Sequence, residues 1–167
     1  YTLNLADAEG KLASREAKMV MMCSPHNPCG RAWSEEELAS VAALCYKYGV
    51  PLACDEIHAD FVYQPAKHHS VLEAPHAREF AVMLCAASKT YNVAGLQQSA
   101  IVCENETMRE RICQEINACG VKSGNVFALA ATRAAYTDCD AWLDGLKAYL
   151  MENRDFVMKY AKENFPK

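Results

Sequence analysis

The stretch KMVMMCSPHNPCGRAWSEEELASVAALCYKYGVPLACD, residues 18–55, decides the fold. It opens with a short, nearly continuous apolar run, and the two prolines and the glycine of residues 24–30 then exclude helix or central strand. Ser34 with Glu37 three positions later forms a capping box, and apolar residues at helical spacing follow it. A second apolar run, residues 50–54, leads to an aspartate. The stretch therefore predicts strand, turn, helix and strand.

The same alternation continues along the chain. Apolar runs predict strands over residues 80–85 and 99–103, and the spacing of apolar residues predicts helices over 106–118, from about 126 to 136, and over 142–164. Nearly continuous apolar strands that alternate with helices favour an α/β fold with a mostly parallel sheet. A nicotinamide-binding domain is disfavoured because no GxGxxG follows any of the expected strands.

The composition is that of a folded protein with a sizeable core. Of the 167 residues, 51% are hydrophobic and 23% are charged, and the net charge is −4. This length predicts one sizeable domain. The mild acidity without a basic cluster argues against a nucleic-acid partner. No apolar run approaches the ~18 residues that a membrane span needs. We expect neither nucleic acid nor membrane as a partner.

Nine cysteines are many for a chain of this length, yet they include no CxxC pair and no zinc spacing. Several lie within apolar runs, as Cys85 and Cys103 do, where cysteine behaves as a small buried hydrophobe. We expect free structural thiols in a reducing cytoplasm, with disulfides or a metal as the alternatives. The adjacent His68 and His69 lack a carboxylate pattern, so we expect a solvated loop there and no metal site.

Polar side chains stand where three of the expected strands end: Asn27, Asp55 and Lys89. Ligands of open α/β sheets bind beyond the carboxyl ends of the strands. A lysine in such a low-dielectric position is a candidate amine nucleophile or base, and with an acid partner it suits pyridoxal-phosphate chemistry. The ordinary alternative is a surface lysine, a capping aspartate and a turn asparagine, and spacing alone favours this alternative.

Three local sequences resemble motifs of the fold-type I pyridoxal-phosphate enzymes, the class I and II aminotransferase superfamily. Residues 24–31 (SPHNPCGR) resemble its asparagine–proline turn, residues 54–60 (CDEIHAD) its aspartate motif, and residues 88–96 (SKTYNVAGL) its Schiff-base lysine motif. They occur in the family's order with family-like gaps, and the resemblance extends over nearly the whole chain. It implies a three-layer αβα fold with a mostly parallel sheet, of which this chain holds the large domain, incomplete.

Within the superfamily, the details are similar to the cystathionine β-lyase branch, the bacterial carbon–sulfur lyases of the MalY and PatB type. His58 stands where most aminotransferases carry tyrosine. Gln97 stands where most carry an arginine that helps to hold the cofactor phosphate. The sequence PHNP in the turn and the sequence AGLQ after the lysine agree with the same branch.

The resemblance implies a role for each matching residue. Lys89 would form the Schiff base with pyridoxal 5′-phosphate and then remove the substrate α-proton, and Asp55 would pair with the pyridine nitrogen. Asn27 would hydrogen-bond the phenolic oxygen, and His58 would lie near that oxygen. Ser88 would contact the phosphate. The ordinary alternatives are an Asx turn for Asn27, a packed histidine for His58 and a capping serine at Ser88.

The implied reaction is β-elimination from cystathionine or another cysteine S-conjugate, which gives a thiol, pyruvate and ammonia. An aminotransferase is an alternative, because it needs the same Lys89 and Asp55. A catalytically silent fragment or binding module of the same fold is another. The residues do not choose among cystathionine, cystine and other cysteine conjugates as the substrate.

The resemblance also has implications for the organisation of the protein. Family enzymes are considerably longer, and this chain has no initiator methionine. We therefore expect residues 1–167 to be a partial large domain that lacks an N-terminal segment and the C-terminal small domain. Family enzymes form dimers with shared sites, so we expect a homodimeric parent protein that acts on a small amino acid. We expect this chain alone to bind the cofactor weakly.

Overall fold

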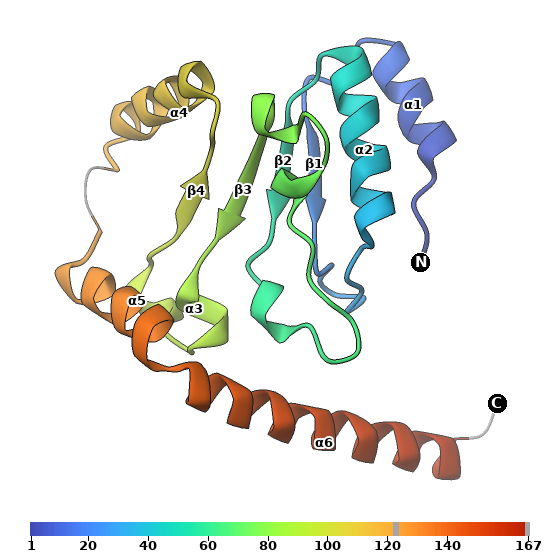
Figure 1. The fold of residues 1–167 in the computed structure, drawn as a ribbon, viewed down its shortest axis with the longest axis vertical. Coiled ribbons are helices and arrows are strands. Elements are labelled where there is room, and N and C mark those ends of the chain that lie inside the picture. The colour runs from blue at the N-terminus through green and yellow to red at the C-terminus, as the bar shows by residue number, and fades with distance from the viewer. Residues whose placement is uncertain (122–123, 166–167) are drawn as a thin grey trace.

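The structure, a computed structural model, describes residues 1–121 and 124–165. In this part of the chain, strands β1 (Val20–Cys23), β2 (Leu52–Asp55), β3 (Ala81–Cys85) and β4 (Ala100–Val102) form one sheet in that order (Figure 1). The first three strands are parallel, and β4 runs antiparallel to β3. The expected α/β fold with a mostly parallel sheet is confirmed.

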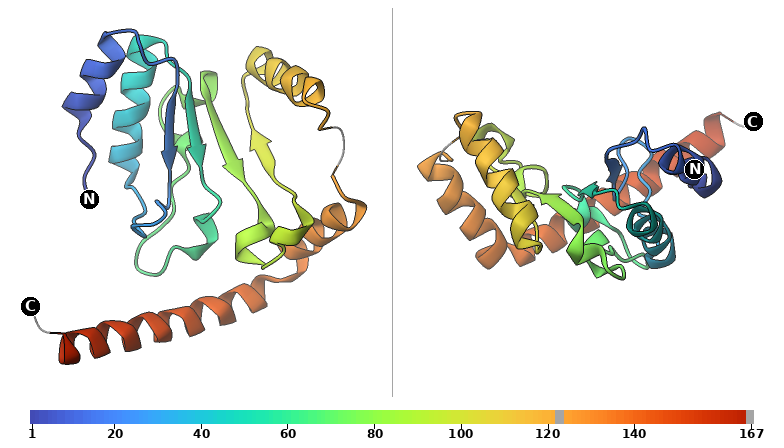
Figure 2. Two further views of the ribbon diagram at one scale, coloured as in Figure 1. Left: turned by 180° about the vertical axis from the view of Figure 1, so that it is seen from behind. Right: turned by 90° about the horizontal axis from the view of Figure 1, so that it is seen from above.

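In the described chain, one long helix precedes the first strand, one lies between β1 and β2, and three follow β4. Helix α1 (Leu5–Ala13) lies beside α2 (Glu35–Tyr48), and α4 (Glu106–Ala118), α5 (Val126–Asp138) and α6 (Asp140–Asn164) follow β4 (Figures 1 and 2). Shorter helical segments connect them: η1 (Ala59–Phe61), η2 (Val71–Glu73), η3 (Ala77–Glu79), α3 (Ala87–Thr90) and η4 (Ala94–Leu96). Helix α1 is the one long helix of the described residues that the sequence pattern did not predict.

Helix α2 begins and ends where its sequence predicts. The Ser34 hydroxyl accepts a hydrogen bond from the Glu37 N–H at 3.2 Å, and the Ser34 N–H donates to the Glu37 carboxylate at 2.9 Å. Gly49 ends the helix with a φ of 65°, a left-handed conformation that glycine adopts without strain. Between these ends, the buried side chains Leu38 and Cys45 form an apolar stripe that faces the sheet.

The core lies between α2 and the β1–β3 part of the sheet. Its buried members are Ala42, Cys45, Leu52, Cys54, Val71, Leu72, Ala74, Ala77 and Ala81. Burial raises the pKa of the Cys45 thiol to about 11, and it raises the pKa of Cys54 further. All nine cysteines are free, as predicted, although Cys113 and Cys119 are exposed.

Strand β4 and the helices that follow it bury far less. All three residues of β4 are exposed, and neither α4 nor α6 has a buried residue. Large apolar side chains stand in solvent there: Ile101, Val126, Phe127, Leu129, Trp142, Tyr149, Phe156, Val157, Met158, Tyr160 and Phe165. None of the helices in residues 1–121 and 124–165 has both the length and the hydropathy needed to cross a bilayer.

Candidate functional site

The carboxyl ends of the three parallel strands meet at one edge of the sheet. The register pairs Cys23 at the end of β1 with Asp55 at the end of β2, and Asp55 with Leu84 near the end of β3. Asn27 follows β1, and Lys89 lies on α3 directly after β3. The three polar residues predicted at strand ends therefore stand along the same edge, at which β1, β2 and β3 end in Figure 1.

The turn that carries Asn27 is held by its own backbone. The His26 N–H donates to the Arg31 carbonyl at 2.7 Å, and the Gly30 N–H donates to the His26 carbonyl at 2.8 Å. The indole N–H of the buried Trp33 donates to the Cys23 carbonyl at 2.9 Å and ties the turn to the end of β1. The Asn27 side chain is exposed beyond this rigid turn.

The guanidinium of Arg31 is engaged by neighbouring side chains. It lies 2.6 Å from the Glu37 carboxylate and 4.4 Å from the ring centroid of Trp33. Arg31 therefore forms a half-buried ion pair beside the turn.

Asp55 closes β2 with its carboxylate half-buried. Its Oδ1 accepts a hydrogen bond from the Ile57 N–H at 3.0 Å, and this bond fixes the side chain against the following turn. No residue in the described segments donates to Oδ2 within hydrogen-bond distance. One carboxylate oxygen of Asp55 is thus held by the protein, and the other is available to a ligand.

The next residue, Glu56, forms a buried network that the sequence analysis missed. Its carboxylate accepts hydrogen bonds from His68 Nε2 at 2.8 Å, from the Ser70 hydroxyl at 3.1 Å and from the Val71 N–H at 2.8 Å. Only 1% of the Glu56 side chain is exposed. The expectation of a solvated loop is wrong for His68, because its ring packs on this buried carboxylate. The partners are 12 to 15 residues apart in sequence, and no local pattern signals them.

The segment with Ser88 and Lys89 forms the short helix α3. Ser88 is half-buried and Lys89 is exposed, so the expected low-dielectric position of Lys89 is wrong for this chain. The buried Thr90 anchors the helix, since its hydroxyl donates to Asp60 Oδ2 at 2.7 Å. That bond joins α3 to η1, so Asp60 has a structural role here.

An aromatic cluster joins α3 to the C-terminal helices. Tyr91 stacks on Trp142 of α6 with ring centroids 5.8 Å apart, and it meets Tyr136 of α5 edge-on at 5.7 Å. Desolvation, with a smaller contribution from the nearby Asp60 carboxylate, raises the pKa of Tyr136 to about 12. The phenol therefore stays protonated as part of this packing.

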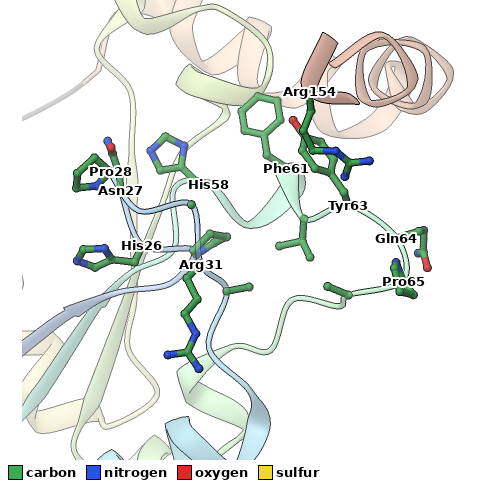
Figure 3. Close-up of a pocket in the computed structure, with 15 residues that line it drawn as sticks. His26, Asn27, Pro28, Arg31, His58, Phe61, Tyr63, Gln64, Pro65 and Arg154 are labelled. Carbon is green, nitrogen blue, oxygen red and sulfur yellow. The ribbon is translucent and has the colours of Figure 1, made fainter. Parts of the chain in front are cut away.

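A cavity of about 750 Å³ opens beside the strand ends (Figure 3). Asn27 and His58 both line it, together with Phe61, Tyr63 and Arg154. The Arg154 guanidinium of α6 lies 5.5 Å from the ring centroid of Tyr63 and closes one side.

The structure thus brings two of the predicted site residues, Asn27 and His58, to one cavity. The other three are not among its lining residues. Asp55 is the last residue of β2, and Ser88 and Lys89 belong to α3, so these three stand along the same sheet edge beside the cavity.

The structure is an α/β domain in which an aspartate, an asparagine and an exposed lysine stand along one edge of the sheet. The chain belongs to the class I and II aminotransferase family, whose model matches residues 1–163.

Two curated relatives cover nearly all of the chain. Cystathionine β-lyase PatB of Bacillus subtilis is 34% identical over 168 residues, which cover 100% of this chain and 43% of that protein. Protein MalY of Escherichia coli is 33% identical over 98% of this chain and 42% of its own length. The chain therefore spans less than half the length of the curated relatives that it matches.

A solved structure is similar over the whole fold. Cystalysin from Treponema denticola, whose crystal structure contains a pyridoxal 5′-phosphate cofactor, superposes with a TM-score of 0.96 at 29% identity. The match covers 99% of this chain and 42% of that chain.

Proposed function

We propose that the protein to which this chain belongs is a pyridoxal-phosphate-dependent carbon–sulfur β-lyase. It cleaves a cysteine thioether, such as cystathionine or another cysteine S-conjugate, into a thiol, pyruvate and ammonia. The observation that carries this proposal is the convergence of Asn27, Asp55 and Lys89 on one sheet edge in a member of this family. The relatives named cystathionine β-lyase and carbon–sulfur lyase support it.

The groups along this edge fit the chemistry of pyridoxal 5′-phosphate. Asp55 offers a carboxylate oxygen for the pyridine nitrogen, and Asn27 offers an amide for the phenolic oxygen. Ser88 offers a hydroxyl for the phosphate. Lys89 offers an exposed amine that no described carboxylate pairs within 4.0 Å. When bound, the cofactor supplies an electron sink for the α-carbon of the substrate.

Each residue then has a defined task. Asp55 holds a proton on the pyridine nitrogen, because its carboxylate favours the charged form of that nitrogen. Lys89 binds the cofactor through its Nζ and afterwards carries the α-proton of the substrate. Asn27 and His58, which line one cavity, orient the phenolic side of the ring. Ser88 positions the phosphate from the start of α3.

His58 and Gln97 favour a lyase over an aminotransferase, because the common aminotransferase pattern has tyrosine and arginine at these positions. Among the relatives that match nearly the whole chain, PatB also favours the lyase, since it is named a cystathionine β-lyase.

We also propose that residues 1–167 are part of the large domain of a longer, homodimeric enzyme. The apolar side chains exposed on β4, α5 and α6 support this proposal, since they need a cover that the described residues do not provide. The coverage of less than half of each relative agrees with it. The nine free thiols support a reducing cytoplasmic location.

The test uses the full-length enzyme with cystathionine and measures thiol and pyruvate in the absence of a keto acid. We expect both products from the wild type and from Lys11→Ala, a control at an exposed lysine of α1. We expect none from Lys89→Ala. A strict requirement for a keto acid would indicate the aminotransferase instead. Turnover that survives Lys89→Ala would refute the assignment of Lys89, and a wild type that binds cofactor without turnover would indicate a silent relative.

A further inference from the structure

One thiol of the chain is paired with a histidine. His26 Nδ1 and Cys29 Sγ lie 2.8 Å apart within the turn after β1. In residues 1–121 and 124–165, no other cysteine makes a hydrogen bond to a histidine ring. A base within hydrogen-bond reach of a thiol is the arrangement that activates cysteine as a nucleophile.

The geometry of this pair is fixed by the turn. Both backbone groups of His26 are hydrogen-bonded, its N–H to Arg31 and its carbonyl to Gly30. Its ring meets the edge of the buried Trp33 at a centroid distance of 6.2 Å and an interplanar angle of 66°. The imidazole nitrogen is therefore held at the thiol.

The environment of Cys29 differs from that of the other thiols. Burial raises the pKa of Cys45, Cys54 and Cys85, so these thiols remain protonated and unreactive at neutral pH. Cys113 lies exposed on α4, without a histidine partner in the described chain. Cys29 is half-buried and has both a neighbouring base and a path to solvent.

The turn that carries Cys29 borders the cavity of about 750 Å³. Its residues His26, Pro28 and Gly30 line the cavity, whereas Cys29 itself does not. The half-buried thiol is therefore reached from solvent and not through the cavity.

We propose that Cys29 is a modification site that exchanges with small-molecule disulfides. Nδ1 of His26 takes the thiol proton, and Sγ of Cys29 attacks one sulfur of the small molecule. A bond forms between these two sulfurs, and the original disulfide bond breaks. The other half leaves with the electron pair as a thiolate, which then takes the proton from His26. The product is a mixed disulfide at Cys29, and no further oxidant is needed.

The test treats the full-length protein, freed of reductant, with oxidised glutathione at neutral pH and follows each cysteine by peptide mass mapping. We expect the adduct to form at Cys29 about tenfold faster than at the exposed Cys113 or Cys119. His26→Asn keeps a hydrogen-bonding group near the thiol but removes the base, so it should slow labelling of Cys29 about tenfold. The rates at Cys113 and Cys119 should stay unchanged.

Cys29→Ser should abolish the adduct on the peptide that contains residue 29. Equal rates at Cys29, Cys113 and Cys119 in the wild type would overturn the proposal, and this comparison holds even if His26→Asn fails to fold. A folded His26→Asn protein that is labelled at the wild-type rate would overturn it as well.

The reaction is independent of the proposed lyase activity, so Lys89→Ala should be labelled at Cys29 as fast as the wild type in the absence of added cofactor. A wild-type protein that is labelled at Cys29 but shows no β-elimination would refute the proposed function alone.

Discussion

We expect the buried carboxylate of Glu56 to be a main determinant of stability where β2 ends. Replacement by glutamine keeps the shape of the side chain but turns one acceptor oxygen into an amide donor. Its remaining oxygen can still accept from Ser70 and Val71, as Oε1 does now. The new amide group then faces His68 Nε2.

The loss of stability follows from the three groups that donate hydrogen bonds to Glu56. The glutamine can pair with His68 Nε2 only if that ring carries its proton on Nδ1, a buried atom without a partner in the described chain. One donor is orphaned in either case, so Glu56→Gln should lower the free energy of unfolding by about 1–3 kcal/mol. Glu56→Ala removes all three bonds and should cost about 3–5 kcal/mol.

Urea denaturation of the full-length protein, followed by far-ultraviolet circular dichroism, measures these values. The matched control is Glu104→Ala, which breaks an exposed ion pair with Arg78 and should cost less than about 1 kcal/mol. If Glu56→Ala unfolds at the same urea concentration as Glu104→Ala, the buried network does not stabilise the fold, and the reasoning is refuted.

Three further changes test other contacts. Ser34→Ala removes the cap of α2 and should cost about 1 kcal/mol in a thermal melt, whereas Ser40→Ala within the same helix should be nearly neutral. Thr90→Val should cost about 1–3 kcal/mol because it leaves the Asp60 carboxylate without its donor, and Thr90→Ser should restore the stability. Burial raises the pKa of Cys45 to about 11, so the unfolded chain loses this proton first as the pH rises. Unfolding free energy should therefore fall between about pH 8.5 and pH 11, and Cys45→Ala should reduce this slope in urea titrations.

The elements that sequence predicted well are those with strong local signals. The capping box of Ser34 and Glu37 located α2, and the apolar runs located all four strands within two residues of their observed ends. Helix α1 was not predicted because only two of its apolar residues, both leucines, are large, although Asn4 caps it by accepting from the Asp7 N–H at 3.1 Å.

The part that could not be predicted depends on contacts between distant segments. Glu56 gains its role only when the fold brings His68 and Ser70 to the end of β2. The exposure of Lys89 has a related cause. Apolar spacing does not report burial by itself, since α6 has helical apolar spacing but no buried residue within the described segments. Likewise, no local sequence pattern indicates that Asn27 and His58 line one cavity, and only the folded structure shows it.

The antiparallel direction of β4 separates the edge of the sheet that carries Asn27, Asp55 and Lys89 from the opposite edge. After α3, the chain turns away from the strand ends along β4, forms α4 at the opposite edge of the sheet, and returns with α5 (Figures 1 and 2). Substitutions in α4 therefore lie at the edge opposite Asn27, Asp55 and Lys89. A reporter or a changed surface charge on α4 would stand far from these three residues.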